Sequence, residues 1–218
     1  MAPRTDRATL AAEVRAALEG CCPGSHTHLR GSLAAGTADA YSDIDIAWVV
    51  PDTQFSASLS LAVSTLRRVQ PVESVRTDPD FQRSDRRRLL FVRFAEVSLF
   101  WRLDLDVHTE SVADNPYYDT GNPSARAREG DWSRPASALA NAIGAVKAAA
   151  RQRHDEARGM LDRGFARIGE EDRATGAWAY DVARLAHAIA QRDSSLADLA
   201  AGVTTLASQH IPGAEAGW

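Results

Sequence analysis

The sequence predicts an α+β protein, in which a small mixed sheet flanked by helices is followed by a C-terminal helical bundle. Before residue 110, short segments rich in β-branched and aromatic residues alternate with helical patterns. From Pro135 onward the chain is rich in alanine, which favours helices. Residues 113–134, which include Asn115-Pro116, are rich in turn formers. We therefore expect a first domain over 1–112, a linker over 113–134 and a helical bundle domain over 135–218, with a ligand cleft between the two halves.

The first domain is expected to alternate helices and strands. Apolar residues at helical spacing predict helices over 5–18 and 56–69, and residues 33–38 are expected to form a short helical turn. Segments of strand composition are predicted over 26–30, 43–50, 72–75, 89–94 and 97–107. The last two are expected to pair antiparallel around Ala95-Glu96.

The second domain is expected to be an up-and-down bundle of four helices, because the connections between its helical segments are short. The predicted helices cover residues 135–151, 154–168, 173–192 and 195–210. Trp178 and Tyr180 on the third helix are interpreted as bundle core, with base stacking or acceptor binding as the alternative.

Charge and composition narrow the function classes. The net charge of −4 argues against a nucleic-acid partner, which usually calls for a basic excess. The basic cluster at 86–88 is flanked by acids, so we interpret it as a solvated loop or a phosphate contact. The N-terminus lacks the apolar core of a signal peptide and no segment reaches transmembrane length. We therefore expect a cytoplasmic protein with no membrane partner.

Two carboxylates begin the strand predicted over 43–50. Side chains alternate along a strand, so Asp43 and Asp45 share one face while Ile44 and Ile46 share the other. Two like charges this close are unfavourable unless a cation neutralises them, and carboxylate oxygens suit Mg²⁺ bound together with substrate phosphates. A solvated strand end is the alternative interpretation. A small-residue turn, Gly31-Ser32, is separated from Asp43 by ten residues and is suited to hold a phosphate.

Gly31-Ser32 followed by Asp43-x-Asp45 on a strand resembles the nucleotidyltransferase superfamily of DNA polymerase β, in its small two-domain branch that modifies small molecules such as antibiotics. The resemblance implies a nucleotidyltransferase-type fold and a catalytic role for residues 1–112. It implies Mg²⁺, or Mn²⁺ in its place, bound by Asp43 and Asp45, and a nucleotide phosphate held by Gly31 and Ser32. Ser42 is a further nucleotide-binding candidate, or only closes a turn.

A second acidic strand strengthens the resemblance. Asp104 and Asp106 lie on one strand face, and Arg102-x-Asp104 resembles the superfamily element that carries the third catalytic carboxylate. The resemblance therefore assigns Asp104 to the second metal ion. Asp106 is a further ligand, the general base or a solvated strand end. Arg30 contacts phosphate or pairs with an acid of the site.

Lys147 is the only lysine of the chain. The resemblance implies that a lysine on the first helix of the helical half reaches the triphosphate, and a solvated surface lysine is the alternative. His108 follows the acidic strand and either lies at the cleft or is a structural histidine.

These observations predict an enzyme that transfers a nucleoside monophosphate from an NTP, with ATP favoured, to a hydroxyl of a small molecule. Two-metal catalysis would release pyrophosphate. The alternatives are nucleotidylation of a partner protein, of toxin–antitoxin or regulatory type, and a catalytically silent nucleotide-binding module. Nothing in the sequence identifies the acceptor or the oligomeric state.

Overall fold

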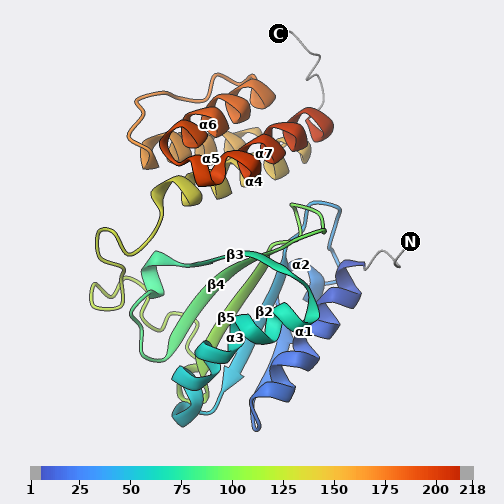
Figure 1. Cartoon of the computed structure of the whole chain (residues 1–218), viewed down its shortest axis with the longest axis vertical. Coiled ribbons are helices and arrows are strands. Elements are labelled where there is room, and N and C mark those ends of the chain that lie inside the picture. Colours follow the sequence, from blue (N-terminus) through green and yellow to red (C-terminus); the bar gives the residue numbers. More distant parts are fainter. Residues whose placement is uncertain (1–5, 212–218) are drawn as a thin grey trace. The chain divides into compact units, whose positions relative to one another are not determined.

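The computed structural model describes residues 6–211, and it divides into two compact units, residues 1–132 and 133–218, each described here by itself (Figure 1). Thr5, the first residue of the predicted 5–18 helix, and residues 212–218 of the predicted bundle domain lie outside the described range. Among the described residues, no helix is both long and apolar enough to cross a membrane.

The first unit is built on one mixed sheet of five strands. Its strand order is β1-β2-β5-β4-β3; β2 and β5 are parallel, and the other neighbours are antiparallel. The helices and strands of this unit are α1 (Arg7–Cys21), β1 (His26–Leu29), α2 (Gly31–Ala34), β2 (Ile44–Val50), α3 (Phe55–Val69), β3 (Val72–Thr77), β4 (Arg87–Phe94) and β5 (Leu103–Thr109).

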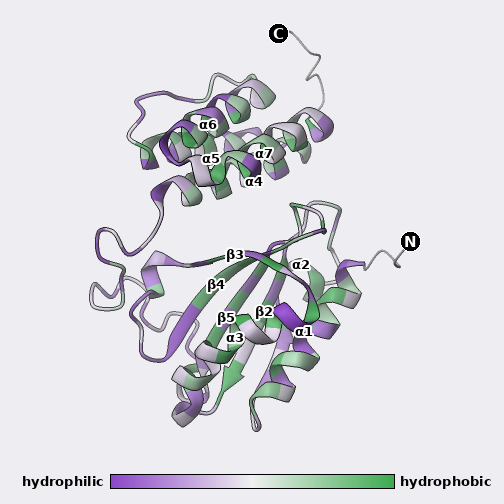
Figure 2. Ribbon diagram, in the orientation of Figure 1, coloured by the Kyte–Doolittle hydropathy of each residue, from purple (hydrophilic) through white to green (hydrophobic). Residues whose placement is uncertain are grey.

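One face of the sheet forms the core of this unit, together with α1 and α3. Alternate residues of β2 and β5 enter this core, where they meet Leu10, Val14 and Leu18 of α1 and Leu66 of α3. Both helices carry green and purple residues in Figure 2, as expected of helices that bury one side. We call the other side of the sheet, which carries Asp45 and Asp104, its open face.

The second unit consists of α4 (Arg134–Ala150), α5 (His154–Arg167), α6 (Trp178–Arg192) and α7 (Ala197–His210). Among them, α4 packs against α5, α6 and α7. The α+β prediction, a small mixed sheet with helices followed by a helical half, is therefore confirmed.

Three details of the sequence prediction are wrong. The strand predicted over 97–107 begins only at Leu103, because the preceding residues form a turn in which Glu96 has a φ of 62°. The helix predicted over 173–192 begins at Trp178, since the buried Asp181 carboxylate accepts hydrogen bonds from the backbone N–H groups of Thr175 and Gly176. Tyr180 is 52% exposed and so lies outside the bundle core.

Candidate functional site

The parallel pairing of β2 and β5 brings the predicted metal ligands together. In this register Asp45 lies directly opposite Asp104, and Asp43 comes immediately before β2. Neighbouring strands are about 4.8 Å apart, so the two paired carboxylates begin from adjacent positions on the open face. We call Asp43, Asp45 and Asp104 the carboxylate cluster.

Arg102, just before β5, is the cation of this cluster. Its Nε and Nη2 donate hydrogen bonds to the two Asp104 oxygens at 2.5 and 2.7 Å, and Nη2 lies 3.9 Å from Asp43 Oδ2. Its guanidinium also stacks over the Phe91 ring, 4.7 Å from the ring centre. Sequence reasoning used Arg102 only as part of a motif. The signal for its contact was its position two residues before Asp104, on the same side of an extended chain.

The pKa of Asp104 shows that Arg102 does not fully offset the effects of burial and of the neighbouring acids. Burial raises the pKa of Asp104 from its usual 3.8 to about 6, Asp43 and Asp45 act in the same direction, and Arg102 opposes them. Asp43 and Asp45 therefore repel the Asp104 carboxylate, and a further cation would reduce this repulsion.

The predicted phosphate turn at Gly31 lies directly against the carboxylate cluster. Its φ of 56° lies in the left-handed region, and a Cβ at this position would overlap the Asp45 carboxylate. The backbone N–H of Arg30 also donates to the carbonyl of Asp45 at 2.8 Å. Ser32 follows within α2 and is half-buried. The turn and the acids thus lie together, while phosphate binding by Gly31 and Ser32 stays a prediction.

Ser42 has the alternative role given to it above. Its hydroxyl donates to Asp39 Oδ1 at 2.9 Å and accepts from the Asp39 backbone N–H at 3.0 Å. The side chain is buried and closes a turn. These contacts agree with the turn-closing alternative, and nucleotide binding by Ser42 stays a prediction.

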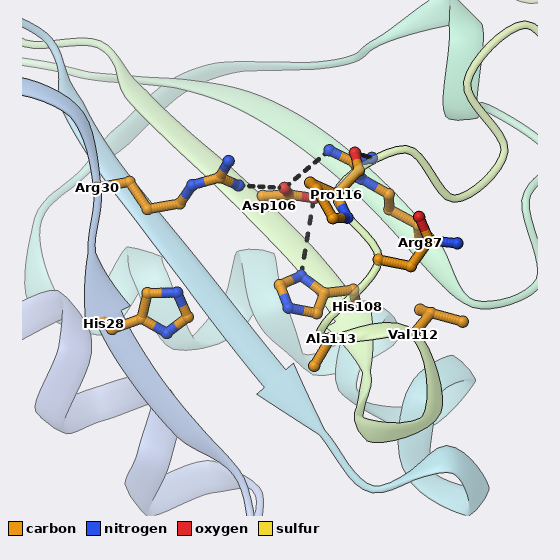
Figure 3. A pocket seen from close by; sticks show the side chains of 9 residues that line it. His28, Arg30, Arg87, Asp106, His108, Val112, Ala113 and Pro116 are labelled. Atoms are coloured by element: carbon orange, nitrogen blue, oxygen red, sulfur yellow. Dashed lines mark hydrogen bonds and ion pairs between the residues drawn. The ribbon is translucent and has the colours of Figure 1, made fainter.

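Asp106 is not a solvated strand end. The residue is 5% exposed, and its oxygens accept hydrogen bonds from Arg30 Nη1 at 2.6 Å and from Arg87 Nε and Nη2 at 3.0 Å each (Figure 3). Roles as a ligand or base stay predictions, but both would compete with two guanidinium groups. Arg30 therefore pairs with an acid, one of its two predicted alternatives.

The same contacts correct the interpretation of the basic cluster at 86–88. Arg87 and Arg88 belong to β4 rather than to a solvated loop, and the Arg87 side chain is only 12% exposed. Sequence reasoning missed Arg87. The available signal was the alternation that begins there, in which Leu90, Val92 and Phe94 enter the core.

Lys147 lies on α4 of the second unit and is 8% exposed, so it is not the solvated lysine of the alternative interpretation. Its contact with a triphosphate stays a prediction, as does the ligand cleft between the two halves.

The donor chemistry of the carboxylate cluster fits Mg²⁺. Within residues 6–211, no group of three or more His, Cys, Asp or Glu side chains is arranged so that it could hold a metal ion. Magnesium does not require one, since it is usually bound through one or two carboxylates together with substrate phosphates and water. The facing pair Asp45 and Asp104, with the Gly31 turn against Asp45, provides that kind of open site.

Comparisons with known proteins give only a loose structural likeness. The chain matches no protein-family model and no curated protein. The solved GLD-2/RNP-8 complex matches with a TM-score of 0.39 at 19% identity, over 67% of this chain and 48% of that chain. The noncanonical poly(A) polymerase complex GLD-2–GLD-3 matches with a TM-score of 0.35 at 18% identity, over 66% of this chain and 42% of that chain. Cid1, described as an RNA terminal uridylyl transferase, matches with a TM-score of 0.39 at 16% identity, over 72% of this chain and 41% of that chain.

This chain thus spans less than half the length of each of these solved chains. With TM-scores below 0.5, the function has to be inferred from the site of this chain itself.

Proposed function

We propose that this protein is a Mg²⁺-dependent nucleotidyltransferase that moves a nucleoside monophosphate from an NTP, with ATP favoured, to a hydroxyl group. One observation carries the proposal. Asp45 faces Asp104 across two parallel strands while the Gly31 turn packs against the Asp45 carboxylate. Side chains suited to divalent cations and a backbone suited to phosphate therefore lie side by side.

The residues would divide the work as follows. Asp43 and Asp45 would hold the ion that accompanies the triphosphate, and Asp104 would complete the position nearest the acceptor. Gly31 leaves room for a close approach of backbone to phosphate. When bound, Mg²⁺ would neutralise phosphate charge and lower the pKa of the acceptor hydroxyl. Arg102 would keep Asp104 oriented and partly neutralised before the ion arrives.

For the acceptor we propose a small molecule. The net charge of −4 gives the chain no excess of cations for a nucleic-acid backbone. Nucleotidylation of a partner protein is the second candidate, and RNA, the substrate named for Cid1, is included as an outcome of the test.

The test is label transfer from each of the four NTPs, labelled at the α-phosphate, with Mg²⁺ and with separate pools of metabolites, RNA and protein. We expect pyrophosphate release and label in the metabolite pool. Asp45→Asn should abolish both, whereas Asp198→Asn, the same change at an exposed position of α7, should leave them unchanged. A folded Asp45→Asn variant with normal turnover would refute the proposal. Binding of NTP without pyrophosphate release would identify a silent nucleotide-binding module.

A further inference from the structure

A second site lies on the same open face, beyond the carboxylate cluster. It is a pocket of about 260 Å³ (Figure 3). Its ionisable lining comes from His28 and Arg30 at the end of β1, Arg87 of β4, and Asp106 and His108 of β5. All of these residues belong to the first unit, and none has a role in the nucleotide site proposed above.

The pocket carries a net positive charge. Arg87 is fully engaged, because Nε and Nη2 bind Asp106 while Nη1 donates to the carbonyl of Pro116 at 2.8 Å. Arg30 gives Asp106 only Nη1, and its side chain is 45% exposed. Within the described part of the chain, Nε and Nη2 of Arg30 have no acceptor. Two guanidinium groups against one carboxylate leave one positive charge and a set of free N–H donors.

The remaining walls suit an organic ligand. Burial lowers the pKa of His108, so at neutral pH its imidazole is uncharged and offers one N–H donor. Val112 and Pro116, from the segment after β5, add apolar surface. A pocket with a few placed donors and an apolar side is typical of sites for small molecules.

We propose that this pocket binds the carboxylate or phosphate group of a small organic anion, and that this anion is the acceptor of the nucleotidyl group. The second part rests on the proposed function. Asp106 lies two residues beyond Asp104 on the same strand face, about 7 Å away at the usual rise of a strand. An acceptor anchored at Arg30 whose hydroxyl is about that far from its anionic group would place this hydroxyl at the carboxylate cluster.

The reaction would then be a simple displacement. The acceptor oxygen forms a bond to the α-phosphorus, and the bond from the α-phosphorus to the bridging oxygen breaks. Pyrophosphate leaves with that electron pair, and the hydroxyl proton passes to solvent water. Asp106 would act as a positioning residue, because it orients the two arginines rather than touching the reacting atoms.

Binding is tested without Mg²⁺ or nucleotide, so its outcome does not depend on the proposed activity. Inorganic phosphate, and in a second series acetate, is titrated while the side-chain NMR signals of the histidines are followed. The signals of His28 and His108 should shift. Arg30→Gln should weaken binding about tenfold or more, because a charge-assisted contact is lost while Arg87 still holds Asp106. Arg30→Lys, which keeps the charge, should retain most of the affinity.

Two further variants serve as controls. Arg67→Gln removes the same charge from the exposed surface of α3 and should bind like wild type. Asp45→Asn should also retain binding, since its side chain lies outside the pocket. The proposal is overturned if neither His28 nor His108 responds to phosphate or acetate, or if Arg30→Gln binds as tightly as wild type.

The acceptor role is tested with matched hydroxyl compounds: glucose 6-phosphate against glucose for phosphate, and 4-hydroxybutyrate against 1-butanol for carboxylate. The anionic member of at least one pair should be preferred, and Arg30→Gln should raise its KM while the KM for ATP stays the same. Equal use of charged and neutral members would overturn the acceptor role and leave the transferase function standing. Absence of any pyrophosphate release would count against the transferase function. In that case the titrations with phosphate and acetate would still show whether the pocket binds anions.

Discussion

Two aspartates of β5, separated by one residue, have opposite surroundings. Asp104 faces another acid, Asp45, on β2, and the nearest cation is a single arginine. Asp106 faces the small Ala47 on β2, which leaves room for Arg30 to reach across from the end of β1 (Figure 3). The strand gives both carboxylates the same orientation, so the difference comes from their neighbours.

The comparison shows how one sheet face can hold two kinds of site. The carboxylate cluster brings three acids together and is suited to cations. The pocket around Asp106 has two arginines to one acid and is suited to anions. The Mg²⁺ ion that accompanies an NTP would find negative charge at the carboxylate cluster, and an anionic acceptor would find positive charge at the pocket, so that each is attracted to its own part of the face.

The largest expected effect separates the two aspartates in catalysis. Asp104→Asn should lower kcat by about a thousandfold or more, because it removes several kcal/mol of charge stabilisation near the acceptor. Asp106→Asn should act mainly on the acceptor KM. Single-turnover transfer assays measure both variants. An inactive Asp106→Asn beside an active Asp104→Asn would show that the third catalytic carboxylate lies two residues later than proposed.

For the stability of the fold, Asp106 should matter more than Asp104. Asp106→Asn leaves Arg87 buried without its counter-charge and should lower the free energy of unfolding by about 3 kcal/mol. Chemical denaturation of the wild type and of each variant measures these free energies. Asp80→Asn is a suitable control, because its pair with Arg126 is more than half exposed, and it should lose less than about 1 kcal/mol. Equal losses in both variants would mean that burial does not set the strength of the Asp106 contacts.

Gly31→Ala tests the approach of the turn to the carboxylate cluster. Alanine at a φ of 56° should lower the free energy of unfolding by about 1–2 kcal/mol. The added methyl group also overlaps Asp45, so turnover should fall about ten- to a hundredfold. Gly36→Ala provides the match, since Gly36 has a φ of 68° and a methyl group there would meet no atom within 4 Å. Gly36→Ala should lower the free energy of unfolding but keep the turnover of wild type. A loss of turnover in both variants would mean that backbone strain, rather than the overlap with Asp45, causes the effect.

The smallest effect concerns His108 and pH. Because its pKa is lowered in the folded protein, the unfolded chain binds this proton more readily. The stability that His108 contributes is complete above its unfolded pKa of about 6.5 and is lost as the pH falls through the lower folded value. His108→Gln should therefore lose less Tm than wild type between about pH 7 and pH 5. Parallel Tm curves for the two proteins would contradict the assignment.

The local parts of this structure were predictable from sequence. The two-residue repeat of a strand places Asp43 with Asp45 and Asp104 with Asp106, because that geometry depends only on neighbouring residues. The strand predicted over 43–50 is found as β2, Ile44–Val50, because its apolar, β-branched composition is also a local property.

What could not be predicted depends on register between strands. Arg87 meets Asp106 because β4 pairs antiparallel with β5 and places Leu89 opposite Asp106. No local pattern contains that alignment, so the contact between Arg87 and Asp106 could not be predicted, although the alternation of β4 itself could have been recognised. The start of α6 was missed for a different reason, since it depends on a local hydrogen bond from the backbone N–H of Gly176 to the buried Asp181 carboxylate.

The strand order has a consequence for how the protein is made. β5 is synthesised last of the five strands, yet it occupies the middle of the sheet. Until it emerges, β1–β2 and β3–β4 can form only as separate pairs of strands, each with an inner edge that lacks a neighbour. Insertion of β5 closes both edges at once and brings Asp104 beside Asp45 in the same step. The repulsion that Asp104 exerts on Asp43 and Asp45 therefore arises only when the sheet is completed, and a nascent chain that ends before Leu103 has neither a continuous sheet nor the complete carboxylate cluster.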